Sequence, residues 1–530
     1  MNKNRIIPGE TDQGALFATH YIGDRLSKDH EVFAFQKLVK SLNLSAITNS
    51  YSREGGSMFS PMDLFSIVCY GYQKGIVSSY QLAEAVANRL DFIYLAGGHQ
   101  VKRRTLSEFR RRHRNAISDL LLQSINIAIK AKLVKPESIF ALDGSKIFAS
   151  ANYDRRKNRE DLQEEQGKLM KSVEDFLNEW EKNDEAEENI EEERAQRMRE
   201  VRERLNNLPT PKPTLPTRLP TEEELKKIHN RKKEPTKPDT NEPGLFNVKS
   251  EKDAEKAIER ASKIAIALEK NPSATINMTD PDSRLMKFGN NIKEGYNAQV
   301  ISSNHFIVAA DVCLSENDQD QLEPMLNSLL EIIKPDENDT IQFLADAGYN
   351  RGANLAWLET KPEIDPYISM YRRKDENEFS KEAFKYDEAR DEYTCPEGKI
   401  LEHSREVTRG DGKTSIYGAT LQKCVFCKNR EKCLSGDDVS RGYRTISDDA
   451  FAPLRHAMRD KMKVEESKLL YRKRSGAIES IFGYLKMKGL RHFRMRGLEG
   501  VRAEFLLAAL ALNLKRISRA QKKESMIQAA

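Results

Sequence analysis

At 530 residues with 38% hydrophobic side chains, the chain is too long for one hydrophobic core and predicts about three or four domains. Its formal net charge is only +5, but 32% of its residues are charged and its mean hydropathy is −0.69, so long stretches are expected to face solvent. No run reaches the roughly 18 apolar residues of a membrane span, and the N-terminus lacks the apolar core of a signal peptide, so we predict a cytoplasmic protein.

Residues 1–130 are predicted to form an all-helical domain. Apolar residues recur at helical spacing, and Ser60 and Ser78 suit helix N-termini. The stretch "VKRRTLSEFRRRHRN" then places seven Lys or Arg between 101 and 114 against one Glu. A solvated helix face is one explanation. The alternative is that this dense positive charge binds a polyanion such as DNA, because arginine side chains form bidentate contacts with phosphate groups. The candidate DNA contacts are Arg103, Arg104, Arg110 and Arg111.

Two short segments, "FALDG" at 140–144 and "FLADAG" at 343–348, share one pattern. In each, an apolar run leads into an aspartate and then into a residue with little or no side chain. Continuous apolar runs are typical of parallel strands buried on both faces, and ligands of open α/β sheets collect at the carboxyl ends of such strands. We therefore expect Asp143 and Asp346 to meet, although each Asp by itself is compatible with an ordinary strand end.

The order of predicted elements indicates an α/β fold of the ribonuclease-H-like type, interrupted by two insertions. The first insertion is long, charged and helical, contains a Pro- and Thr-rich connector, and shows no apolar core of its own. Asn297 and Gln299, on a strand beside the first Asp, are candidates for phosphate contact. The expected domains are 1–130, helical; 135–154, first part of the core; 155–270, first insertion; 275–360, second part of the core; 362–460, second insertion; and 465–518, C-terminal helices.

A third carboxylate is expected on the C-terminal basic helix. Residues 471–496 carry eight Lys or Arg and one acid, Glu479. Glu479 lies beside an apolar stripe, and Lys486 follows two turns later on the same face. Three acids would hold two Mg²⁺ ions. Two such ions, about 3.5–4 Å from each other, catalyse phosphodiester displacement. Glu499 and Glu504 are rivals for the third position, but their context is that of ordinary caps or salt bridges.

Four of the six cysteines lie within forty residues of one another. Cys424 and Cys427 form a CxxC pair, and Cys395 and Cys433 flank it. Four thiolates are the number that a structural zinc site requires. The alternative is that these are separate core or loop cysteines. A catalytic zinc is not expected, because four cysteine ligands would leave no open position.

The sequence resembles the DDE transposases of bacterial insertion sequences, in the group with the Y-x2-R-x3-E-x6-K signature. Tyr471, Arg474, Glu479 and Lys486 match it, with an Arg-to-Glu gap one residue longer. The segments "ALDGSKIFASAN", "MTDPDSRLMK", "GYNAQV" and "LADAGYN" are similar to recurring segments of these enzymes, and the N-terminal region resembles the helical module ahead of their catalytic domain.

The resemblance implies that Asp143, Asp346 and Glu479 hold Mg²⁺ or Mn²⁺. It implies that DNA is cut at terminal inverted repeats and that the freed 3′-hydroxyl attacks target DNA. It further implies that Tyr471, Arg474 and Lys486 contact the cleaved end, and that a homodimer acts on DNA in the bacterial nucleoid. Two alternatives are a nuclease of this fold without strand transfer and a non-catalytic DNA-binding remnant.

Overall fold

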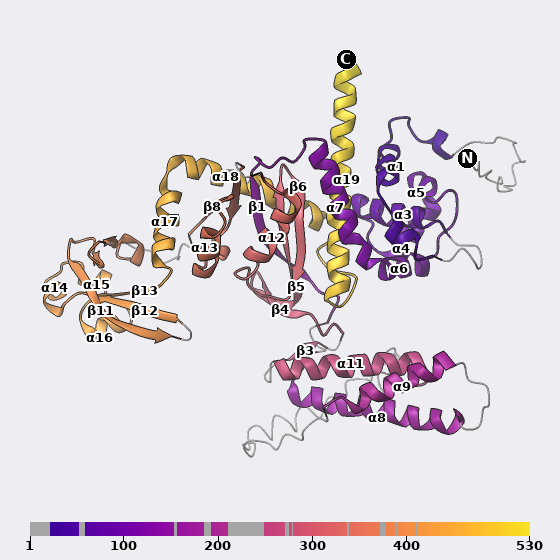
Figure 1. Ribbon diagram of the computed structural model, residues 1–530, viewed down its shortest axis with the longest axis horizontal. Coiled ribbons are helices and arrows are strands. Elements are labelled where there is room, and N and C mark those ends of the chain that lie inside the picture. Colours follow the sequence, from indigo (N-terminus) through magenta and orange to yellow (C-terminus); the bar gives the residue numbers. More distant parts are fainter. Residues whose placement is uncertain are drawn as a thin grey trace, which may run out of the picture. The chain divides into compact units, whose positions relative to one another are not determined.

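The computed structural model describes residues 22–51, 59–152, 156–184, 192–209, 248–270, 275–277, 279–336, 339–370, 378–387, 389–409 and 412–529. The chain divides into two compact units (Figure 1). Unit 1 comprises Met1–Ile147 and Tyr296–Ala530, and unit 2 comprises Phe148–Gly295. Unit 2 is therefore an insertion into unit 1.

The N-terminal part of unit 1 is helical, as predicted. Ser60 Oγ accepts the Asp63 backbone N–H, with Pro61 as the first helical residue, and Ser78 Oγ accepts the Gln81 N–H at 3.1 Å. Both predicted helix starts are thus confirmed as N-caps. The helices are α1 (Glu31–Ser41), α2 (Ser45–Thr48), α3 (Pro61–Lys74), α4 (Ser79–Asn88), α5 (Leu90–Leu95), α6 (Arg103–Arg112) and α7 (Ile117–Lys130), with 3-10 turns η1 (Ile22–Arg25) and η2 (Arg114–Ala116).

A mixed sheet forms the centre of unit 1. Its strands, six within the described residues, follow the order β4-β5-β1-β7-β8, and β6 also pairs with β5. The strands and the helices between them are β1 (Phe140–Phe148), β4 (Arg284–Phe288), β5 (Asn291–Ser303), β6 (Phe306–Cys313), α12 (Leu322–Ile333), β7 (Ile341–Ala345), the 3-10 turn η4 (Ala347–Tyr349), α13 (Gly352–Glu359) and β8 (Ile364–Ile368). The pairing of β1 with β7 is parallel, as the two apolar runs predicted.

Residues 378–450 form a second, antiparallel sheet in the order β13-β12-β11-β10-β9. Its elements are η5 (Lys381–Ala383), β9 (Lys385–Asp387), β10 (Glu392–Thr394), β11 (Ile400–Arg409), β12 (Gly412–Gly418), α14 (Leu421–Val425), α15 (Arg430–Cys433), α16 (Asp437–Arg441) and β13 (Thr445–Asp449). Strand β8 pairs with β7 in the central sheet, although it lies inside the 362–460 range expected for the second insertion.

Three helices complete unit 1: α17 (Ala452–Lys463), α18 (Glu465–Met487) and α19 (Leu498–Ala529). The apolar run near the C-terminus was predicted to be a buried helix, and Phe505–Asn513 are indeed buried within α19. This helix packs against α3, α7 and β6, which joins the N-terminal helices to the central sheet. None of the helices within the described ranges combines the length and apolarity needed to cross a bilayer.

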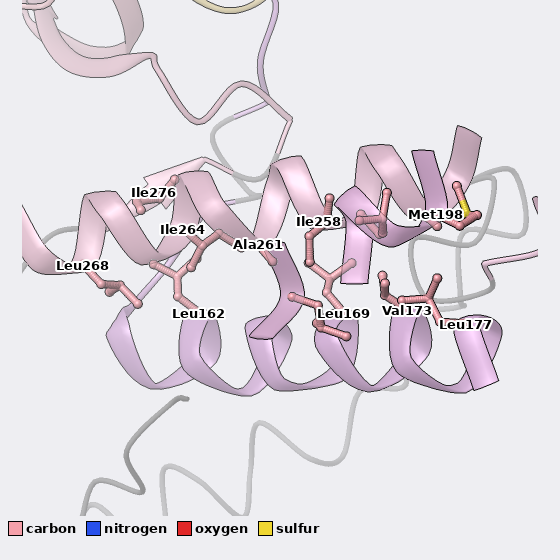
Figure 2. Packing of buried hydrophobic residues seen from close by; sticks show 14 residues of the cluster. Leu162, Leu169, Val173, Leu177, Met198, Ile258, Ala261, Ile264, Leu268 and Ile276 are labelled. Carbon is pink, nitrogen blue, oxygen red and sulfur yellow. The ribbon is translucent and has the colours of Figure 1, made fainter. Parts of the chain in front are cut away.

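Unit 2 has a hydrophobic core, which corrects the expectation that this insertion lacks one. Helices α8 (Arg159–Asp184), α9 (Glu192–Asn206) and α11 (Glu251–Lys270) pack around Leu169, Val173, Ile258 and Ile264 (Figure 2). The apolar stripe on each helix is thin, so the core becomes evident only when the three stripes face one another. The short strands are β2 (Arg156–Lys157), β3 (Ile276–Asn277) and β4 (Arg284–Phe288). The expected Pro-rich connector lies outside the described residues.

Candidate active site

Asp143 on β1 lies beside Asp346, which directly follows β7. The register pairs Leu142 with Ala345, and each aspartate is the next residue in the chain. Asp143 Oδ1 accepts the backbone N–H of Gly144 (2.9 Å), and Asp346 Oδ1 accepts that of Gly348 (2.8 Å). Backbone bonds of this kind hold each carboxylate at the carboxyl end of its apolar run, which is where ligands of α/β sheets bind.

Helix α18 lies against this strand end through two basic residues. Arg474 Nη1 is 3.4 Å from Asp143 Oδ2, and both side chains are largely buried. Lys486 Nζ donates a hydrogen bond to Ser145 Oγ at 2.6 Å. The Arg474 guanidinium also lies 5.8 Å from the ring centre of Tyr471. Three of the four signature residues are therefore grouped near Asp143 or its neighbours.

Glu479 occupies a different environment on α18. It is exposed, and its Oε2 accepts a hydrogen bond from Ser475 Oγ at 2.7 Å. Within the described ranges, no three His, Cys, Asp or Glu side chains are arranged to hold a metal ion. The structure thus brings Asp143 and Asp346 together but leaves Glu479 outside their contacts.

Burial dominates the electrostatics of the two aspartates. It raises the pKa of Asp143 to about 6; Arg474 opposes this shift, whereas the charges of Asp346 and Asp318 add to it. Burial likewise raises the pKa of Asp346. The hydrogen bond from the Gly348 N–H and the charge of Arg474 oppose this shift, and the charge of Asp318 adds to it. A nearby cation favours the ionised form of a carboxylate, so it stabilises most strongly those carboxylates whose ionisation is unfavourable in the metal-free state.

Asp318 is the acid that sequence reasoning missed. It lies between β6 and α12, and its Oδ1 accepts hydrogen bonds from Asn297 Nδ2 and Gln299 Nε2, both at 2.7 Å. The two amides that were considered for phosphate contact thus bind a carboxylate of the chain itself. Two polar residues on a buried strand were the available signal, because buried amides require partners.

The four candidate arginines of α6 fall into two groups. Arg103, Arg104 and Arg111 are exposed, and the latter two lie 4.0 and 3.2 Å from Glu108. Arg110 instead donates to the Val77 carbonyl (2.7 Å) and to Ser79 Oγ, so its guanidinium is held within the helical domain. Helical spacing explains the difference, because Arg110 follows Leu106, which is buried, by one turn.

The four clustered cysteines line one narrow cavity of about 30 Å³. Cys424 lies in α14 and Cys433 ends α15, Cys395 and Cys427 lie outside helices and strands, and all four are partly buried free thiols. The Lys399 backbone N–H donates to Cys395 Sγ at 3.2 Å. Burial raises the pKa of Cys433 to about 11; Arg444 opposes the shift and the other three thiols add to it.

Two families match the chain. The Transposase domain (DUF772) matches residues 20–112, and the Transposase DDE domain matches residues 394–518. Together these matches identify a DDE transposase of an insertion sequence. The first match contains α6 of the transposase, and the second contains its four clustered cysteines and all of α18. No curated protein and no solved structure matches the chain.

Proposed function

We propose that the transposase cuts DNA at the terminal inverted repeats of its insertion sequence and joins the freed 3′-hydroxyl to target DNA. The observation that carries this proposal is the pairing of Asp143 with Asp346 beside the basic helix α18. A pure DNA-binding protein has no need of two buried carboxylates within a phosphate-binding surface, so this arrangement favours an enzyme.

The donor chemistry of the site fits a hard divalent cation such as Mg²⁺ or Mn²⁺. Asp143 and Asp346 supply carboxylate oxygens, and Glu479 is the proposed third ligand. Bound ions would supply an activated water and neutralise the leaving oxygen of the phosphodiester. Gly348 leaves the turn after Asp346 without a side chain, so that a DNA phosphate can approach the backbone there, whereas Asp318 and Gln299 occupy the space beside Gly144.

The basic residues of α18 are proposed to position the DNA end. Arg474 is already at Asp143 and Lys486 at Ser145, so both cations flank the place where a scissile phosphate would lie. The ring of Tyr471 lies beside the Arg474 guanidinium and would orient it. Guanidinium groups bind phosphate oxygens in a bidentate manner, which favours Arg474 as the main contact.

DNA recognition is assigned to the N-terminal helices. The exposed Arg103, Arg104 and Arg111 are proposed to contact the inverted repeats, whereas Arg110 has a structural role. Because two transposon ends must be processed together, we propose a homodimer on DNA, acting in the bacterial nucleoid.

A structural zinc is proposed for the cysteine module. The four thiols share one cavity, and a backbone N–H already donates to Cys395 Sγ, an arrangement that stabilises a thiolate. Metal analysis of the purified transposase should give about one zinc per chain, and Cys424→Ser should release it. Absence of zinc from the wild-type protein would refute this assignment.

The catalytic proposal is tested with labelled inverted-repeat DNA. In the presence of Mg²⁺ the wild-type chain should give cut ends and joined products. Asp346→Ala should abolish cleavage and leave DNA binding unchanged, because the basic surfaces remain. Asp339→Ala, in the loop before β7, is the matched control and should cleave normally. Cleavage without joined products would instead favour a nuclease, and wild-type binding without cleavage would favour a non-catalytic DNA-binding remnant.

A further inference from the structure

The loop between β6 and α12 directs one of its acids toward the strand ends. In the run "SEND" at 315–318, Glu316 and Asn317 are exposed, whereas Asp318 is partly buried. A loop acid is normally solvated, because burial of a carboxylate without compensation is costly. The inward position of Asp318 therefore requires an explanation.

Buried amides fix Asp318 in this position. Asn297 and Gln299 are 1% and 0% exposed, and both donate to the same oxygen, Oδ1. Gln299 Oε1 in turn accepts the hydroxyl of Tyr349 at 2.5 Å, and Tyr349 is fully buried in the turn that follows Asp346. One hydrogen-bonded chain thus joins Asp318 to the turn that holds Asp346.

The other oxygen, Oδ2, lies near the turn that holds Asp346. A Cβ placed on Gly348 would lie 3.0 Å from Asp346 Oδ1 and 3.8 Å from Asp318 Oδ2, so both oxygens flank one point. A Cβ on Gly144 would lie only 2.3 Å from Asp318 Oδ1. The absence of a side chain at Gly144 therefore leaves room for the Asp318 carboxylate.

An independent observation points to a further group at this place. Asn297 Oδ1 is buried and has no hydrogen-bond partner within the described part of the chain. Buried amide oxygens are almost always paired, with protein or with ordered water. Asn297 Nδ2 already donates to Asp318 Oδ1 and to the Ser315 carbonyl, so an ordered water, free or carried by a metal ion, would satisfy the remaining oxygen.

We propose that Asp318 is a further acid of the metal site, offering Oδ2 to the water shell of an ion held by Asp143 and Asp346, because the described part of the chain places no three acids to ligate one ion directly. Two ions about 3.5–4 Å apart need carboxylates on more than one side, and Asp318 supplies one from a separate loop. This inference rests on the metal-dependent function proposed above. It differs from the signature of the family, in which the third acid comes from α18.

The test is Mn²⁺ binding to the full-length protein without DNA, measured by titration calorimetry. Asp318→Asn keeps the shape and the Oδ1 acceptor but removes the charge, and should weaken binding roughly 10–100-fold. Asp320→Asn is the matched control, because Asp320 lies in the same loop, is exposed and pairs with Arg351. It should bind Mn²⁺ as the wild type does. Asp143→Asn removes a proposed direct ligand, and its loss of Mn²⁺ affinity serves as the reference for the other variants.

A second measurement uses the wild-type chain and does not depend on the folding of a variant. Fe²⁺ with ascorbate and peroxide cuts the backbone near a bound ion, so cuts are expected close to residues 143, 346 and 318, with Mg²⁺ as competitor. Wild-type Mn²⁺ affinity in Asp318→Asn, or cuts at 143 and 346 without one at 318, would overturn the role of Asp318 and leave the proposed function intact. A wild-type chain that binds no Mn²⁺, with or without inverted-repeat DNA, would overturn both.

Discussion

Gly144 illustrates how a single residue position constrains the site. It follows Asp143 on β1, and its hypothetical Cβ would meet Asp318 Oδ1 at 2.3 Å and Gln299 Nε2 at 2.4 Å. Real Cβ atoms are essentially never found so close to a neighbour, so any side chain would force the Asp318 carboxylate and its amide partner apart.

Gly144→Ala should therefore destabilise the transposase by about 1–3 kcal/mol and also weaken Mn²⁺ binding, because overpacking displaces Asp318. Chemical denaturation and calorimetry measure the two effects. Gly483→Ala on α18 is the control, because nothing lies within 4 Å of its Cβ. It should be neutral or stabilising by up to ~1 kcal/mol. Equal stability of the two variants would contradict the packing described for Gly144.

The raised pKa of Asp143 predicts a pH dependence of the metal-free protein. Burial raises this pKa from 3.8 to about 6, so between these values the folded state binds more protons than the unfolded state. The free energy of unfolding should then fall as pH rises through this window. The asparagine in Asp143→Asn does not titrate. The free energy of unfolding of this variant minus that of the wild type should therefore increase from pH 4 to pH 7, by up to ~3 kcal/mol.

Urea unfolding of both proteins at several pH values gives this difference. Added Mg²⁺ at pH 7 should stabilise the wild type more than the variant, because a cation compensates the buried charge. A wild-type minus variant difference that stays constant from pH 4 to pH 7 would show that Asp143 is not buried in this way.

At the scale of elements, α6 presents arginines in two environments on one helix. Arg103, Arg104 and Arg111 are exposed, whereas Arg110 holds the Val77 carbonyl and Ser79. Replacing the three exposed arginines by alanine should weaken DNA binding and reduce its salt dependence. The slope of log K against log salt should become shallower by about 0.9 for each DNA phosphate that the variant no longer neutralises. Binding titrations at several salt concentrations measure this slope.

Arg110→Ala is the matched control from the same helix. It should leave the salt slope unchanged and lower the free energy of unfolding by about 1–3 kcal/mol, because it leaves a buried carbonyl without its donor. A slope that falls with Arg110→Ala and not with the triple variant would reverse the assignment of the two groups.

Helix α18 shows what one additional residue in a motif does. In the family signature the Glu follows the Arg by four residues, which places both side chains on one face of a helix. Here Glu479 follows Arg474 by five residues, which corresponds to a rotation of roughly 140° around the helix axis. Glu479 shares its face with Lys486 instead. This geometry explains why Arg474 contacts Asp143 while Glu479 does not.

Several elements could be predicted because the information is local. Ser60 and Ser78 mark helix starts through their own side chains, and the buried stripe of Ile478, Ile481 and Leu485 follows from helical periodicity. The parallel pairing of β1 with β7 followed from two continuous apolar runs. Asp318 could not be found in this way, because its role depends on amides of β5 that meet it only in the folded chain.

At the scale of the whole molecule, two units with separate cores predict separable effects of core mutations. Leu169 is buried in unit 2, and Leu344 is buried in β7 of unit 1. Leu169→Ala should destabilise unit 2 by about 2–5 kcal/mol, because it leaves a cavity, and should leave Mn²⁺ affinity unchanged. Hydrogen exchange should speed up in α8 and α11 and not in β1 or β7.

Leu344→Ala is the reciprocal variant and should give the opposite pattern, with faster exchange in the central sheet and weaker metal binding. Loss of protection in both units from either substitution would mean that they unfold as one. The core of unit 2 was missed from the sequence because each of its helices carries only a narrow apolar stripe, and the partner of each stripe lies tens of residues away.

The attachment of unit 2 has an evolutionary consequence. Its two ends leave through the neighbouring strands β1 and β5, and the Ala149 N–H donates to the Glu294 carbonyl at 3.0 Å, so the first and last residues of the insertion lie side by side. An ordinary tight turn would span that gap. A single genetic insertion or deletion would therefore add or remove the whole of unit 2 without changing the order of the strands that carry the two aspartates.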